Sequence, residues 1–533
     1  MTKRRQVQKD PAPVFARVNG APKFQAATGY TTRTACAQVL FLPELLGRII
    51  SFTISERDTA LADAVIEESN IPTHSMYPPW PMMLVCRQWR DIVISTPELW
   101  STFIADFSGC SVSDMRHVPR MLDAHLRLSR SHPLTMSFYL ATESWANIGG
   151  QRILDVGGAS PTEMMFVLME KARAHRHRWK HFSVRVDSTQ SYDNPLWLMV
   201  VDNDPIRSRL KHLRMGANLD PHRPYTNHQV QRPPPLDLPP YQGLESLHIT
   251  GPFVVSVQSS GRLAAPLSFP SLRVLRFESH DVNSLCSLWK ILQESPSLEE
   301  AHLAMELPFG PIPNILSPIS LSNLKHLQLS AKIFDVAMTV FSQMNLSSLI
   351  GLELSNVPFL DLHLRRLAQV LRTCNAPFKK CSLYVFGVST PSNAFKCLEA
   401  FAEVLNSMPQ VEHLELAWTK SPPIKCLPAF MHRVLTSILW QKQGTFLPSL
   451  TLLSIDTDVQ DVLSNSSSST HLRSLIVACR RKYQKSIQKF RFGITSNIAV
   501  SKDVSTKFED MLLQDVAVGE CIKAENFEVL VKF

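Results

Sequence analysis

A six-residue pattern of apolar positions, LxxLxL, recurs through most of the chain, with aromatic or other apolar residues replacing some leucines. Copies that start at Leu244, Leu272, Leu298, Leu324 and Leu349 follow one another at intervals of 25 to 28 residues. The alternation at the end of each copy is typical of a short strand, because neighbouring side chains of a strand point to opposite faces. More widely spaced copies start at Trp179, Leu210, Phe378, Val411, Leu450 and Ile487.

Stretches with a helical period of apolar residues separate these predicted strands. They include residues 282–295, 362–373, 393–410 and 471–483. A unit of one strand and one helix, about 30 residues long, cannot bury its own apolar faces and must stack on its neighbours. The pattern therefore predicts an α/β fold over residues 179–533, in which a curved parallel sheet carries helices on its outer side.

Residues 39–104 have a different apolar pattern, which predicts a small all-helical module. One helix begins at Pro43, a second covers residues 82–94, and a short third helix follows the cap residue Thr96. A long insert at 53–80, with a further helix predicted at 58–68, separates the first two helices. In the second helix we expect one apolar face, made of Leu84, Val85, Trp89, Ile92 and Val93.

The flanking segments are less regular. Residues 1–38 are basic and lack a hydrophobic period, so we expect a disordered tail, and residues 105–178 form a linker, a first repeat or a cap. Seven basic residues and one acidic residue lie in the first 40 positions, so the tail carries most of the net charge of +9. The nearly neutral remainder argues against a large nucleic-acid surface. Lys3-Arg4-Arg5 is open to three interpretations: a nuclear-import patch, part of a mitochondrial presequence, or a tail without an address.

Composition and motifs argue against several classes of chemistry. No apolar run approaches the ~18 residues of a membrane span, and no signal-peptide pattern occurs at the start. The ten cysteines are scattered without a CxxC pair, which indicates reduced thiols in a cytoplasmic or nuclear protein. None of the phosphate-binding, nucleophile-elbow or zinc-protease motifs is present. We therefore expect a chain that is not an enzyme and that holds neither a metal nor another cofactor.

Two basic clusters have alternative interpretations. His175, His177 and His181 lie among basic residues; a metal site would need further ligands, so a basic helix end is favoured. A second basic run covers residues 480–491, where either nucleic acid or an acidic partner could bind, or where the charges are simply solvated.

Three segments of the helical module resemble an F-box of the insert-bearing type seen in fungal proteins. They are Leu42-Pro43-Glu44-Leu45-Leu46, Leu84-Val85-Cys86-Arg87-Gln88-Trp89-Arg90 and Thr96-Pro97-Glu98-Leu99-Trp100. The rest of the chain resembles the irregular leucine-rich repeats that often follow an F-box. The resemblance implies a non-catalytic substrate receptor of an SCF-type cullin–RING E3 ubiquitin ligase, which docks on the adaptor subunit, and through it a cullin, while the repeats hold a substrate protein. The implied adaptor-binding residues are Leu42, Pro43, Leu45, Leu46, Ile49, Ile50, Leu84, Val85, Cys86, Trp89, Leu99 and Trp100.

The residue between the last two apolar positions of each copy should point to the concave face of the sheet. This column starts basic and becomes acidic, so we expect its basic part to receive an acidic or phosphorylated segment of the substrate, with an ordinary solvated face as the alternative. The predicted substrate-binding residues are Arg214, His248, Arg276, His302, Gln328, Glu353 and Glu415.

Two other functions remain open at this point. The chain could be a leucine-rich-repeat scaffold that acts outside a ligase, with the helical module as a cap on the first repeat. It could also associate with nucleic acid through the basic tail and residues 480–491.

Overall fold

The computed structural model divides the chain into two units, residues 1–53 and 54–533. In the first unit it describes only Leu45, Gly47 and Arg48, which are helical. In the second unit it describes residues 79–106, 117–141, 161–187, 209–218, 235–238, 241–251, 253–257, 269–279, 282–305, 317–374, 376–386, 394–418, 435–436, 447–456, 463, 466–483, 490–495, 502–522 and 527–532. The predicted tail 1–38, the predicted helix 58–68 and nearly all of the insert 53–80 lie outside the described residues.

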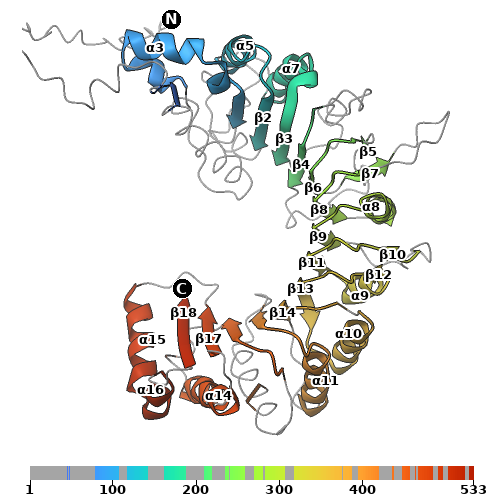
Figure 1. The fold of residues 1–533 in the computed structure, drawn as a ribbon, viewed down its shortest axis with the longest axis vertical. Coiled ribbons are helices and arrows are strands. Elements are labelled where there is room, and N and C mark those ends of the chain that lie inside the picture. Colours follow the sequence, from blue (N-terminus) through green and yellow to red (C-terminus); the bar gives the residue numbers. More distant parts are fainter. Residues whose placement is uncertain are drawn as a thin grey trace, which may run out of the picture. The chain divides into compact units, whose positions relative to one another are not determined.

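A parallel sheet of 14 strands dominates the described part of the second unit, and the strands follow one another in the sheet in chain order (Figure 1). Its strands are β1 (Thr102–Asp106), β2 (Leu134–Ala141), β3 (Trp179–Asp187), β4 (His212–Asn218), β6 (Ser246–Thr250), β8 (Val274–Ser279), β9 (Glu300–Met305), β11 (His326–Ala331), β13 (Gly351–Pro358), β14 (Lys380–Phe386), β15 (His413–Trp418), β16 (Leu452–Asp456), β17 (Phe490–Thr495) and β18 (Phe527–Lys532). Two small parallel pairs accompany it: β5 (Pro235–Leu238) with β7 (Val254–Val257), and β10 (Ile319–Ser320) with β12 (Met344–Asn345).

Helices connect many of these strands and lie on one face of the sheet (Figure 1). They are η2 (Pro81–Leu84), α3 (Arg87–Ser95), η3 (Pro97–Trp100), α5 (Val118–Leu128), α7 (Pro161–Arg173), η5 (Arg176–Arg178), α8 (Val282–Gln293), α9 (Phe334–Ser342), α10 (Asp361–Thr373), α11 (Ala394–Asn406), α14 (Ser466–Tyr483), α15 (Lys502–Gln514) and α16 (Val516–Ile522). We call the opposite face of the sheet, on which no helix of the described residues lies, the helix-free face.

The core lies between the sheet and the helices, and the LxxLxL pattern builds it. In β11, Leu327 and Leu329 are buried, whereas Gln328 between them is partly exposed on the helix-free face. Leu327 lies opposite Ala301 of β9 and Leu352 of β13, so equivalent apolar positions of successive copies stack in one buried row. This shared register explains why one sequence pattern produces a continuous core.

The predicted α/β class with a long parallel sheet is confirmed, and the arrangement is compatible with a solenoid-like fold. Strands β3 to β16 coincide with the predicted copies, apart from the small paired strands between them. Helices α8, α10, α11 and α14 fall in the stretches with a helical period.

The sheet begins two strands earlier than the predicted start at residue 179, because β1 and β2 pair in parallel and β2 pairs with β3. Phe103 lies opposite Met136 of β2, and Met136 lies opposite Phe182 of β3. This register shows an additional copy of the pattern, whose three apolar positions are Trp100, Phe103 and Ala105. The sequence prediction did not include this copy because Trp100 was assigned to the predicted helical module, residues 39–104.

The last predicted copy has the wrong phase. In β17, Phe492 lies opposite Leu453 and Ile494 opposite Ile455, and both are buried, so the last two apolar positions of the copy are Phe492 and Ile494, two residues later than predicted. Both choices place an aromatic residue in the core. Only the packing against β16 decides between them, and it leaves Arg491 exposed opposite Leu452.

Candidate functional site

Three apolar side chains are exposed in the segment just before the first strand: Leu84, Val85 and Ile94, whose exposed fractions are 80%, 59% and 39%. Because they are close in sequence, we call them together the exposed apolar cluster. The predicted helix 82–94 is interrupted here, because η2 ends at Leu84 and α3 begins after Cys86. Cys86 has an extended backbone and caps α3: its Sγ accepts a hydrogen bond from the Trp89 N–H at 3.5 Å. The interruption turns Leu84 and Val85 away from the buried face of α3.

The other predicted members of this helix have different environments. Ile92 and Val93 are buried, Trp89 is half-buried, and Cys86 is exposed. The prediction of one shared apolar face is therefore wrong for Leu84 and Val85, which are free to contact a partner.

Leu99 and Trp100, which the resemblance implies as adaptor-binding residues, are buried, so neither is accessible on the described surface. Trp100 has no exposed surface, lies edge-on to the Trp80 ring at a centroid distance of 5.2 Å, and donates from Nε1 to the Val93 carbonyl at 2.8 Å. The rings of Trp100 and of His125 in α5 have centroids 5.1 Å apart. Burial lowers the pKa of His125 to about 4. Leu99 and Trp100 therefore join the helical segment to the sheet. This is expected for Trp100, which occupies the first apolar position of the additional copy.

The remaining predicted adaptor-binding residues belong to the first unit. Leu45 is helical and exposed. Those outside the described residues are Leu42, Pro43, Leu46, Ile49 and Ile50.

All seven predicted substrate-binding residues lie in one row across the helix-free face, which we call the central row. The register pairs each with its neighbour on the next strand, and Ser382 of β14 lies between the two glutamates. In strand order the row reads Arg214, His248, Arg276, His302, Gln328, Glu353, Ser382 and Glu415.

Hydrogen bonds link the middle and the acidic part of the central row. The Gln328 amide bonds on both sides, to His302 Nδ1 through its oxygen and to Glu353 Oε1 through its nitrogen at 2.9 Å. The Ser382 hydroxyl donates to Glu415 at 3.0 Å. These bonds hold the side chains of five neighbouring strands, in one group of three and one group of two, in defined positions.

The two ends of the row differ in charge. Burial, and then the positive charges of Arg214 and Arg276, lowers the pKa of His248 to about 3, so this imidazole is neutral and the arginines carry the charge. At the other end, burial and then the negative charge of Glu415 raise the pKa of Glu353. The basic and acidic ends that the sequence predicts are therefore present on one continuous surface.

A hollow of about 300 Å³ opens on the helix-free face between β9 and β14. Gly351 forms part of its lining, with His326 and Lys380 on the two neighbouring strands and Glu353 of the central row beside it. Sequence reasoning identified Glu353 but missed Gly351, His326 and Lys380. The signal was available, because a residue two positions before the central row must point to the same face of its strand.

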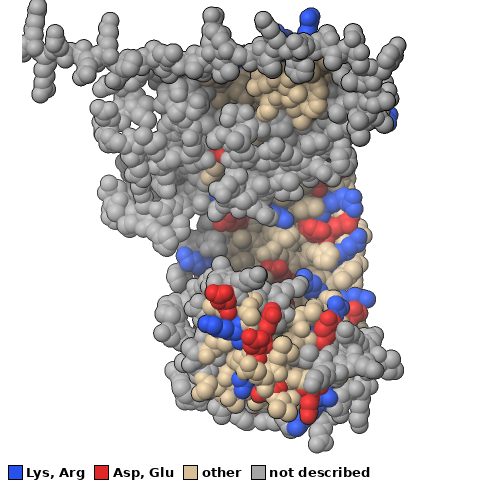
Figure 2. Space-filling view, turned by 90° about the vertical axis from the view of Figure 1, so that its left-hand side faces the viewer, with Lys and Arg blue, Asp and Glu red and all other residues tan. Residues whose placement is uncertain are grey.

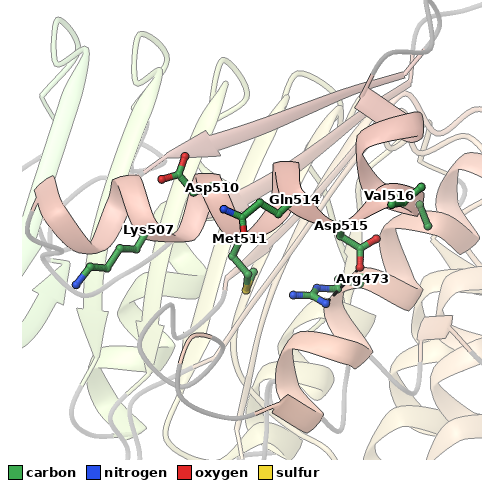
Figure 3. A pocket seen from close by; sticks show the side chains of 8 residues that line it. Arg473, Lys507, Asp510, Met511, Gln514, Asp515 and Val516 are labelled. Carbon is green, nitrogen blue, oxygen red and sulfur yellow. Dashed lines mark ion pairs between the residues drawn. The ribbon is translucent and has the colours of Figure 1, made fainter.

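A larger hollow, of about 690 Å³, lies against α14, α15 and α16 near the end of the chain (Figure 3). Arg473 and Asp515 form an ion pair at 3.2 Å, and Asp515 also accepts the Val518 N–H at 3.0 Å, which caps α16. Lys507 and Asp510 point in different directions, so the charged groups do not converge on a ligand (Figure 3). We regard this hollow as a feature of the packing between these three helices.

In the described residues, each of the two basic clusters is divided between different elements or faces. His175 and His177 have ring centroids 6.4 Å apart, whereas His181 pairs with His212 on the helix-free face. Among the residues that the structure describes, no group of histidine, cysteine or acidic side chains is arranged to hold a metal ion. The run 480–491 is divided between the last turn of α14 and β17, and Arg480 contacts the Cys521 thiol at 3.9 Å.

Basic and acidic side chains are interspersed over the described surface in Figure 2 rather than collected into one basic patch. The described part of the chain also contains no helix that is both long and apolar enough to cross a membrane. All seven cysteines in the described residues are free thiols.

No protein-family model matches this chain, and no curated protein matches it at a significant level.

Proposed function

We propose that this chain is the substrate receptor of an SCF-type cullin–RING E3 ubiquitin ligase, with an F-box-like module before a leucine-rich-repeat region. It contributes no chemistry of its own: the module docks on the adaptor, and the helix-free face of the repeats holds the substrate. The observation that carries the proposal is the exposed apolar cluster at Leu84, Val85 and Ile94, which lies in the segment whose sequence resembles an F-box.

Physical reasoning supports each half of this proposal. Three exposed aliphatic side chains within eleven residues expose an apolar surface, of the kind that usually marks an interface. The central row supports a second, separate surface, because its two glutamates are half-buried and held by hydrogen bonds.

Co-purification with the adaptor subunit tests the first half. The double variant Leu84→Ser, Val85→Ser should lose a stoichiometric complex that the wild-type chain forms. Leu362→Ser is the matched control, because Leu362 of α10 is 75% exposed but lies outside the cluster. A wild-type chain that folds but binds no adaptor would contradict the proposal.

A leucine-rich-repeat scaffold that acts outside a ligase is the second candidate. The burial of Leu99 and Trp100 against the first strand favours it, because a structural cap would use the helical segment in this way. If the chain is such a scaffold, the adaptor should not bind even the wild-type chain. The Leu84 and Val85 substitutions should then leave every interaction of the central row intact.

A further inference from the structure

We propose that the hollow beside Gly351 receives an arginine or lysine side chain of an extended target segment, whose acidic or phosphorylated residue lies over Arg214 and Arg276. This inference rests on the proposed function, because it specifies the chemistry of the segment that the same face would hold. The sequence predicted only that the arginines bind an acidic or phosphorylated segment. The inference adds that Gly351 and Glu353 receive a basic side chain of the same segment.

The absence of a side chain on Gly351 lets the His326 imidazole lie over this glycine, at the edge of the hollow. Gly351 lies between His326 of β11 and Lys380 of β14, in a row where the neighbouring strands carry full side chains. A Cβ atom on Gly351 would come within 2.6 Å of His326 Nδ1, so any larger residue would displace His326 and fill the space. The opening, of about 300 Å³, can admit the end of one long side chain.

The lining of the hollow favours a positive charge. Two carboxylates, Glu300 and Glu353, border it, against the single ammonium group of Lys380. Glu415 adds a further negative charge close enough to raise the pKa of Glu353. An incoming guanidinium would offset this repulsion and form a charge-assisted hydrogen bond with a carboxylate whose position Gln328 fixes at 2.9 Å.

The opposite end of the row favours a negative charge. On β4, β6 and β8, the central row contains two arginines with a neutral histidine between them. Glu278 of β8, two positions after Arg276 in the same strand, accepts the Gly251 N–H at 2.9 Å. A carboxylate or phosphate of the target would meet the positive charges of Arg214 and Arg276 at this end of the central row.

The distance between the two ends limits the spacing in the target. Four strand-to-strand steps separate β6, between the two arginines, from β13, which carries Glu353. At roughly 4.8 Å per step this is about 19 Å, which an extended peptide covers in about five or six residues. The target segment should therefore carry its acidic and basic residues at this separation.

Fluorescence anisotropy with the full-length chain tests the inference. The probes are synthetic peptides in which a pair of aspartates or one phosphoserine is separated from one arginine by a variable polar spacer, made in both chain directions. Matched peptides carry citrulline, which has the shape of arginine without its charge. We expect the tightest binding at a separation of about five or six residues, and about tenfold weaker binding of the citrulline peptide.

Variants of the chain locate the effect. Glu353→Gln should abolish the difference between the arginine and citrulline peptides, and Gly351→Val should weaken binding of the arginine peptide by closing the hollow. Glu412→Gln is the control, because Glu412 pairs with Lys379 at 3.2 Å outside the hollow and should leave the difference unchanged. Thermal unfolding of each variant verifies that it is folded.

Three results would overturn the inference: an arginine–citrulline difference that persists in folded Glu353→Gln, binding without an optimal separation, or no binding of any peptide. Adaptor co-purification reports on the proposed function independently, because it depends on the cluster at Leu84 and Val85. A chain that binds the adaptor but none of these peptides would retain its proposed function and refute only this inference.

Discussion

Replacing Trp100 by alanine should destabilise the start of the sheet while later strands stay folded. Its side chain is fully buried, packs edge-on against Trp80 at 5.2 Å and His125 at 5.1 Å, and donates a hydrogen bond of 2.8 Å to Val93. Removing a buried tryptophan typically costs about 3–5 kcal/mol. We therefore expect a loss of this size in the free energy of opening of β1.

Amide hydrogen exchange measured by mass spectrometry gives the free energy of opening for each segment. One decade of protection corresponds to about 1.4 kcal/mol, so protection of β1 should fall by about two to four decades. The effect should be concentrated in β1 and β2, because strands of a stacked array contact mainly their neighbours. Protection of β11 and β13 serves as the internal reference.

Two further variants separate packing from surface effects. Trp100→Phe keeps an aromatic ring but loses the Nε1–H donor, and should have an intermediate effect. Leu84→Ala removes an exposed side chain and should change stability by less than about 0.5 kcal/mol. Unchanged exchange of β1 in Trp100→Ala, or an equal loss in Leu84→Ala, would refute the assignment of Trp100 to the core.

Two other predictions concern titratable groups. Because burial lowers the pKa of His125 from 6.5 to about 4, the folded chain resists a proton that the unfolded chain accepts, so stability falls as the pH drops from about 6.5 to 4. Between pH 6.5 and 4, urea unfolding should show that the free energy of unfolding of the wild type falls by about 3 kcal/mol more than that of His125→Gln. Parallel pH profiles of the two proteins would contradict this prediction. Iodoacetamide should label exposed Cys86 in the folded chain but not buried Cys381, where burial raises the pKa to about 12. Mass spectrometry of the labelled peptides measures this, and equal labelling would refute the burial of Cys381.

The sequence alone determined the strands from β3 to β16 and the composition of the central row. Both follow from local rules: a period of two sets the face of each side chain, and a repeat with constant phase aligns equivalent residues across the sheet. Arg214 and Glu353 lie in one row for this reason, although 138 intervening residues separate them in the chain.

Tertiary packing decided the remaining features. Trp100 lies in the core because a strand of the sheet follows it, and Leu84 is exposed because the helix breaks at Cys86; the same apolar pattern permits either environment. The phase of β17 depended on its fit against β16, and the hollow at Gly351 depended on what its two neighbouring strands carry. Burial and cavities arise from contacts between segments distant in the chain, and a pattern within one segment does not specify them.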